Sequence, residues 1–233
     1  GPQGSDNLIS SVKRFLVENN IGTLTTEILD KNEILIAPNG ATSLLESIAQ
    51  TLPKGIVITS DPIYYIYSNF LQRCGYEIVA VPEDNEGIRT DLLEQSLDDL
   101  GDRKKDISFI YLVTVNNPTS SILAPERQKQ VIEIACRLSE QLGRKVPVIL
   151  DKAYENLIHD PVAPKLTSAL VYDELGIVYE IYTLSKIIAP ALRIGYMIGP
   201  ASDFTRAIIQ RTSDIGFSAA VMCLEMASVI LDT

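Results

Sequence analysis

Seven short apolar runs alternate with segments of helical periodicity along most of this 233-residue chain, and this alternation restricts the fold more than any other feature. We expect the runs to be strands at residues 33–37, 55–59, 77–81, 107–115, 147–150, 177–183 and 194–199. Strands that are apolar along most of their length and alternate with helices are typical of a largely parallel sheet. The sequence therefore predicts one α/β domain with a mainly parallel seven-stranded sheet and helices on both faces.

The segments with helical spacing lie before, between and after these strands. We expect helices at residues 6–19, 41–52, 63–74, 91–97, 126–142, 202–210 and 217–231. The most apolar stretch, residues 215–231, has 17 residues and contains Glu225. It is too short and too interrupted to span a bilayer, so we interpret it as a core helix.

Charge and cysteine content exclude several classes of protein. Acidic residues outnumber basic ones by 30 to 20, which gives a net charge of −10. This argues against a non-specific nucleic-acid binder and against binding to an anionic membrane. Cys74, Cys136 and Cys223 are far apart and form no Cys-x-x-Cys pair, so neither a disulfide framework nor a metal site is expected. We expect free thiols in a cytoplasmic protein.

Polar clusters follow three of the predicted strands. They occupy residues 116–119, 151–154 and 183–186, and a fourth cluster, residues 39–42, lies between the first strand and its helix. Ligands of such sheets bind beyond the carboxyl ends of the strands. We therefore expect the four clusters to open onto one edge of the sheet and to form a binding site there.

One part of this predicted site suits a phosphate group. Gly40, Ala41 and Thr42 at a helix start offer free backbone N–H groups, a positive dipole end and a hydroxyl. Arg193 offers a bidentate guanidinium for the same dianion. The ordinary alternative is that Gly40 only makes a turn, Thr42 only caps a helix and Arg193 is a solvated charge.

The other part offers a lysine, a carboxylate and two hydrogen-bonding side chains. Lys186 is able to form a Schiff base if its surroundings lower its pKa. Asp151 is suited to hold a proton on a pyridine nitrogen, and Asn117 and Tyr154 to bond a phenolate oxygen. Taken singly, Asn117 before a proline is a common turn and Lys186 an ordinary surface charge. Their combination at strand ends favours a functional site.

These motifs resemble those of the fold-type I pyridoxal-phosphate enzymes, in particular the class I/II aminotransferases. The resemblance covers nearly the whole chain and includes residues 61–64, Asp-Pro-Ile-Tyr, similar to the family's Asp/Glu-Pro-x-Tyr. Residues 185–196 are the strongest match. The spacing from Lys186 to Arg193 is that of the subgroup containing aminoadipate and kynurenine aminotransferases and the aminotransferase-like regulators.

The resemblance implies a role for each residue. Lys186 would carry pyridoxal 5′-phosphate and move a proton between the substrate and the cofactor. Asp151 would pair with the pyridinium nitrogen, Tyr154 and Asn117 would bond the cofactor's O3′, and Tyr64 would stack on its ring. The remaining cofactor-binding residues would hold the phosphate: Gly40, Ala41, Thr42, Thr183, Ser185 and Arg193.

Two departures from the family pattern stand out. Ser120 replaces the glycine of the family's Asn-Pro-Thr-Gly. The family's substrate-carboxylate arginine lies in a C-terminal small domain, and an N-terminal arm carries a tyrosine that reaches the partner's phosphate; neither is expected within residues 1–233. We therefore interpret residues 1–233 as the large, cofactor-binding domain of a longer chain.

The resemblance implies amino-group transfer between an amino acid and a 2-oxo acid by a ping-pong mechanism, in a homodimer. Tyr154 in an Asp-x-x-Tyr context favours this over acyltransferase relatives, which commonly carry histidine near this site. Two alternatives stay open: another reaction on the same fold (lyase, decarboxylase, cyclase or oxidase), and the effector domain of an aminotransferase-like transcription regulator. We expect Lys152 and His159, the one histidine, to have structural roles.

Overall fold

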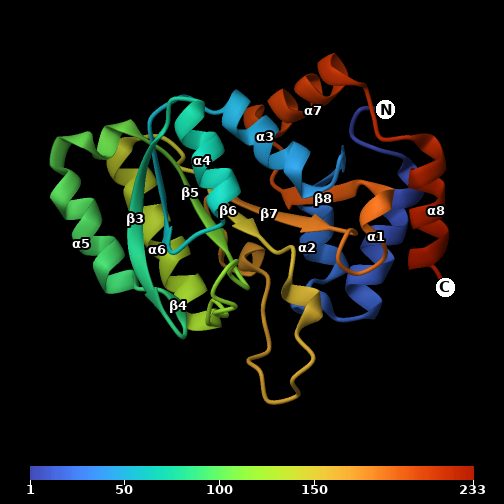
Figure 1. The fold of residues 1–233 in the computed structure, drawn as a ribbon, viewed down its shortest axis with the longest axis horizontal. Coiled ribbons are helices and arrows are strands. Elements are labelled where there is room, and N and C mark those ends of the chain that lie inside the picture. The colour runs from blue at the N-terminus through green and yellow to red at the C-terminus, as the bar shows by residue number, and fades with distance from the viewer.

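An eight-stranded sheet runs through the centre of the molecule and carries helices on both faces (Figure 1). The computed structural model describes all 233 residues. The strand order is β1-β8-β7-β6-β5-β2-β3-β4. The strands are β1 (Glu33–Pro38), β2 (Ile56–Asp61), β3 (Glu77–Asp84), β4 (Gly87–Ile88), β5 (Ile107–Val113), β6 (Val148–Asp151), β7 (Val178–Thr183) and β8 (Ile194–Gly199).

The predicted fold class is confirmed, and each of the seven predicted strands is present. The eighth strand, β4, was not predicted. It has two residues, Gly87–Ile88, and pairs antiparallel with Glu83 and Asp84 at the sheet edge. A pairing this short leaves no periodicity in the sequence, and Gly87 supplies the positive φ of 93° that its turn requires.

The direction of β8 determines which segments meet at one edge. β8 is antiparallel to both of its neighbours, β1 and β7, whereas β3, β2, β5, β6 and β7 run parallel. The beginning of β8 therefore lies beside the carboxyl ends of β1 and β7. Arg193, which directly precedes β8, consequently joins residues that follow the other strands.

The sheet separates two hydrophobic cores. The larger core packs against α1 (Asp6–Glu18), α5 (Thr90–Leu100), α6 (Pro125–Leu142) and α8 (Val221–Leu231). The smaller one packs against α3 (Ala41–Thr51), α4 (Tyr65–Arg73) and α7 (Asp203–Ile215). Successive strand residues alternate between the cores: Ile110 and Leu112 of β5 face the first, and Tyr111 and Val113 face the second.

The structure differs from the predicted helices at a few boundaries. A short helix, α2 (Thr26–Asp30), precedes β1 and was not predicted. Helix α7 continues to Ile215 instead of ending at Gln210, and α8 begins at Val221 instead of 217. The break between the two helices falls at Gly216 and Phe217, and Phe217 has a φ of 67°. Every helix falls short of the length or apolarity that a membrane crossing requires.

Candidate functional site

All eleven site residues singled out in the sequence line one cavity of 170 Å³ at the carboxyl edge of the sheet. Strand ends and helix starts supply them, because the parallel strands and the reversed β8 present their polar flanking residues on the same side. The lining consists of Gly40, Ala41, Thr42, Tyr64, Asn117, Asp151, Tyr154, Thr183, Ser185, Lys186 and Arg193, with Leu45, Val113, Ala153 and Pro190 between them.

Three polar side chains of the cavity converge in front of Gly40. A Cβ atom on Gly40 would lie 3.4 Å from Arg193 Nη2, 3.4 Å from Ser185 Oγ and 3.5 Å from Thr183 Oγ1. Gly40 is also the N-cap of α3, with φ 70° and no side-chain cap. The N–H groups of a helix's first turn have no intrahelical acceptor. This combination of donors forms a cradle that fits a tetrahedral oxyanion.

The guanidinium of Arg193 is positioned by neutral acceptors. Its Nη1 donates to Pro190 O at 2.9 Å and to Ser185 Oγ at 3.4 Å, and its Nη2 donates to Asn39 O at 2.7 Å. Arg193 itself has a φ of 53°. Because no carboxylate neutralises it, its positive charge stays available to an anion in the cradle.

Asp151 also lines the cavity, as a buried carboxylate without a basic partner. Its side chain accepts hydrogen bonds from Tyr111 Oη at 3.0 Å and from the Ala153 amide at 3.1 Å. Burial raises the pKa of Asp151 to about 6, and these two hydrogen bonds oppose that shift. A cation placed in the cavity beside Asp151 would favour its ionised form.

Lys186, Tyr154 and Asn117 line the same cavity as the cradle and Asp151. Lys186 Nζ lies 5.4 Å from the centroid of the Tyr154 ring and has no carboxylate within 4 Å. Asn117 Nδ2 donates to Tyr154 Oη at 3.5 Å. Tyr64 adds an aromatic ring, and burial raises its pKa, with smaller contributions from the nearby Tyr154 and Asp151. The cavity thus holds a lysine, an aromatic surface and hydrogen-bond donors in one place.

Two residues that shape the cavity were missed in the sequence. Tyr111 bonds Asp151, and the available signal was a phenol within an otherwise apolar strand. Gly195 lets β8 approach the start of α3, since a Cβ there would lie 2.6 Å from the Ala41 amide nitrogen. A glycine inside a strand often marks such a close backbone approach.

Lys152 points to the opposite face of the sheet from Asp151, as strand alternation predicts. Its ammonium lies 3.1 Å from Glu155 Oε2 and 3.0 Å from Glu180 Oε1, and all three side chains are buried. Burial lowers the pKa of Lys152, but the two carboxylates outweigh burial and raise it above its usual value. His159 is exposed and lies outside the cavity.

Comparisons with known proteins agree on one family. The sequence model of the family described as aminotransferase class I and II matches residues 3–230. The chain is 28% identical over 168 residues to aromatic-amino-acid aminotransferase 1 of Thermococcus litoralis, covering 70% of this chain and 38% of that protein. It is 26% identical over 184 residues to the "uncharacterized HTH-type transcriptional regulator YisV" of Bacillus subtilis, covering 78% of this chain and 34% of that protein.

The fold has close counterparts among solved structures. The multiple substrate aminotransferase from Thermococcus profundus superposes with a TM-score of 0.86 at 21% identity, over 99% of this chain and 54% of that chain. The present chain therefore spans about half the length of that structure. It spans 34–38% of the length of the curated relatives that it matches first.

Proposed function

Because this chain belongs to the aminotransferase class I and II family, we propose that it binds pyridoxal 5′-phosphate and moves an amino group between an amino acid and a 2-oxo acid. The family membership confirms the resemblance found in the sequence. The observation that carries the proposal is that an oxyanion cradle, an unpaired lysine and an unpaired buried carboxylate line one cavity.

The residues of the cavity fit this cofactor at both of its ends. The space in front of Gly40, bounded by Arg193, Ser185 and Thr183, suits the phosphate. Asp151 has no cationic partner in the protein, so its carboxylate suits a protonated ring nitrogen. Ala41 and Thr42 would add donors from the first turn of α3, and Tyr64 would cover the ring.

Each of the polar cavity residues has a separate role in the proposed reaction. Lys186 would hold the cofactor through Nζ, and its free amine would move the proton at the substrate's Cα. Asp151 would keep a proton on the ring nitrogen, and Asn117 and Tyr154 would donate hydrogen bonds to the phenolic oxygen. When bound, pyridoxal 5′-phosphate supplies an electron-withdrawing ring that stabilises negative charge at Cα. The reaction would run as two half-reactions in a ping-pong order.

We also propose that the protein works as a homodimer in the cytoplasm. Helix α8 supports an association, because several of its apolar side chains are exposed, among them Val221, Met222 and Val229. Light scattering on the cofactor-loaded protein tests this. A monomer that holds one cofactor per chain would refute a site shared between subunits.

A second candidate function is effector binding in a transcription regulator. It is supported by the Bacillus subtilis relative, whose match covers more of this chain than the aminotransferase match does, 78% against 70%. Such a domain would bind the cofactor and an amine without repeated turnover.

One experiment separates the two candidates. The protein is loaded with pyridoxamine 5′-phosphate and mixed with a panel of 2-oxo acids, while absorbance and amino-acid formation are followed. Conversion of the bound cofactor to its aldehyde form, with one equivalent of amino acid formed per cofactor and repeated turnover once an amino-acid donor is added, supports the aminotransferase. Binding without amino transfer for every 2-oxo acid favours the regulator, and no binding of the cofactor contradicts both.

A further inference from the structure

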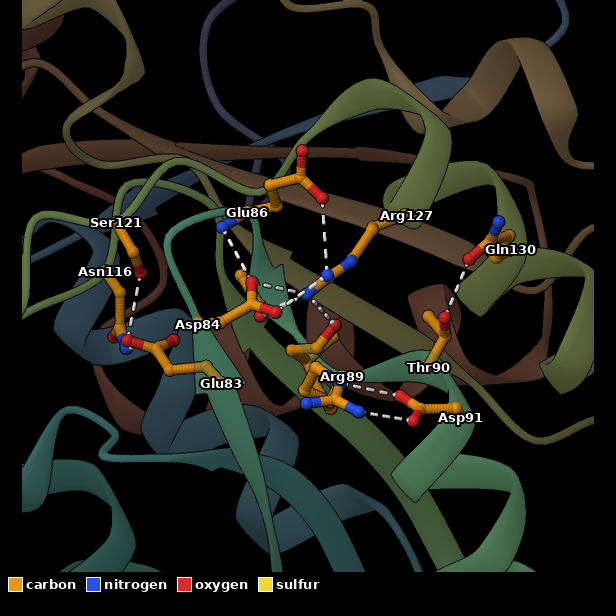
Figure 2. Close-up of polar contacts among 12 residues, drawn as sticks. Glu83, Asp84, Glu86, Arg89, Thr90, Asp91, Asn116, Ser121, Arg127 and Gln130 are labelled. Carbon is orange, nitrogen blue, oxygen red and sulfur yellow. Dashed lines mark hydrogen bonds and ion pairs between the residues drawn. The ribbon is translucent and has the colours of Figure 1, made fainter.

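Asn117, which lines the cavity, belongs to the loop from Asn116 to Ser121. One acidic side chain outside the cavity holds this loop in place through hydrogen bonds. Glu83, at the end of β3, accepts hydrogen bonds from three loop side chains: Asn116 Nδ2 at 2.9 Å, Thr119 Oγ1 at 2.6 Å and Ser121 Oγ at 2.9 Å. Figure 2 shows Asn116 and Ser121 beside Glu83, whereas Glu86 lies beside Arg127.

The same cluster reaches the segment that carries Tyr64. Asn116 is buried, and its Nδ2 donates to Pro62 O at 2.8 Å as well as to Glu83. The side-chain Oδ1 of Asn116 has no hydrogen-bond partner, so only the two bonds donated by Nδ2 hold the side-chain amide in place. Removing the carboxylate of Glu83 therefore removes one of the two contacts that orient this amide.

The loop needs such support because its backbone is strained. Ser120 has a φ of 63°, a left-handed conformation that favours glycine over other residues. Two backbone bonds close the turn, from the Ser120 amide to Asn116 O at 2.7 Å and from the Asn116 amide to Ser121 O at 2.9 Å. The bonds to Glu83 act on the residues at both ends of this turn.

We infer that Glu83 is a positioning residue, which holds the Asn116–Ser121 loop so that Asn117 faces the cofactor. The placement of Asn117 toward the cofactor's phenolic oxygen rests on the proposed function. The contacts of Glu83 with the loop do not depend on the cofactor, so this part of the inference is tested in the cofactor-free protein.

The first measurement is amide hydrogen exchange in the cofactor-free protein. Glu83→Ala should accelerate exchange of the Asn116 and Ser120 amides at least tenfold, and Glu83→Gln, which keeps one acceptor oxygen, at least threefold. The amide of Ile110, which donates to Pro147 O within the sheet, serves as the internal reference and should be unchanged. Glu86→Ala is the matched control, since it removes the same charge from a side chain that pairs only with Arg127.

The second measurement is the dissociation constant of pyridoxal 5′-phosphate. We expect it to rise about five- to tenfold in Glu83→Ala and to stay unchanged in Glu86→Ala. Equal exchange rates in the Glu83 and Glu86 variants would overturn the inference, as would acceleration at Ile110 to the same degree. If the unmodified protein binds no pyridoxal 5′-phosphate, the proposed function fails, and the exchange rates still decide whether Glu83 holds the loop. If Glu83→Ala does not fold, Glu83→Gln alone decides.

Discussion

Tyr111 donates a hydrogen bond to Asp151 between neighbouring strands β5 and β6, with 3.0 Å between Oη and Oδ2. Both side chains are buried, and no basic side chain neutralises the carboxylate. The proton affinity of Asp151 is therefore governed by burial, opposed by this bond and by the Ala153 amide. The carboxylate of Asp151 therefore has no cationic partner within the protein, and a cationic group of a ligand would supply one.

Replacing Asp151 with asparagine should stabilise the cofactor-free protein at pH 7. Burial raises the pKa of Asp151 from 3.8 to about 6, so the folded state binds this proton more tightly than the unfolded chain does. The stability contributed by the group is present below about pH 4 and is lost as the pH rises through about 6. Asp151→Asn should therefore add about 1–3 kcal/mol to the free energy of unfolding at pH 7 and nothing at pH 4.

Urea denaturation at several pH values checks this prediction, with Glu86→Gln as the exposed control. A variant that is less stable than the parent at pH 7 would contradict it.

In the loaded protein the same substitution should permit cofactor binding but reduce amino transfer more than a hundredfold, about 3 kcal/mol in the barrier. A rate close to that of the unmodified protein would exclude Asp151 from holding the ring proton.

Gly40→Ala should block the phosphate cradle. The new Cβ would occupy the space that Arg193, Ser185 and Thr183 surround, so the dissociation constant of pyridoxal 5′-phosphate should rise about a hundredfold, or about 3 kcal/mol. Binding of pyridoxal, which lacks the phosphate, should change much less.

The control for Gly40 is Gly101→Ala. Gly101 has a similarly unfavourable backbone conformation, φ 52° and ψ −126° against φ 70° and ψ −161° at Gly40, but no atom lies within 4 Å of a new Cβ there, so it carries the backbone strain alone. Isothermal titration calorimetry on both variants separates strain from occlusion. Equal losses of affinity in the two variants would show that the cradle is not the phosphate site.

Lys186 should be the residue that borohydride reduction links to the cofactor. It is the lysine that lines the cavity, and its Nζ has no carboxylate partner. Peptide mass spectrometry after reduction should find the label on the peptide containing Lys186 and none on Lys152, which is buried between Glu155 and Glu180. Label on a different lysine would refute the assignment.

Lys152→Met should destabilise the fold by about 3–5 kcal/mol, because it leaves two buried carboxylates without their cation. The loss should shrink at low pH, since burial already raises the pKa of Glu155 and protonation removes the repulsion. Lys129→Met, which breaks an exposed pair with Glu133, should cost less than about 1 kcal/mol. Similar unfolding midpoints for Lys152→Met and Lys129→Met would contradict this prediction.

Much of the fold could be predicted from local patterns. Each of the seven apolar runs is a strand. All of them except β3 are buried along most of their length, and a strand buried on both faces leaves a continuous apolar signature that needs no knowledge of its neighbours. Nine of the eleven candidate site residues could be found for a related reason: parallel strands present their carboxyl ends at one edge, so polar residues at or after those ends gather there. Tyr64 was assigned through the family resemblance, and Arg193 through its guanidinium and that resemblance.

Other features depended on which strands are neighbours, and strand order is absent from the local sequence. The bond from Tyr111 to Asp151 requires β5 and β6 to be adjacent, and the placing of Arg193 beside Gly40 requires β8 to run antiparallel between β1 and β7. The partners of Lys152 and Glu83 likewise come from distant segments. The seven main strands and the chemical groups at their ends could be predicted, because periodicity and residue type are local properties of the chain. Which of these groups are in contact could not, because contact, burial and proton affinity arise only when separate segments pack together.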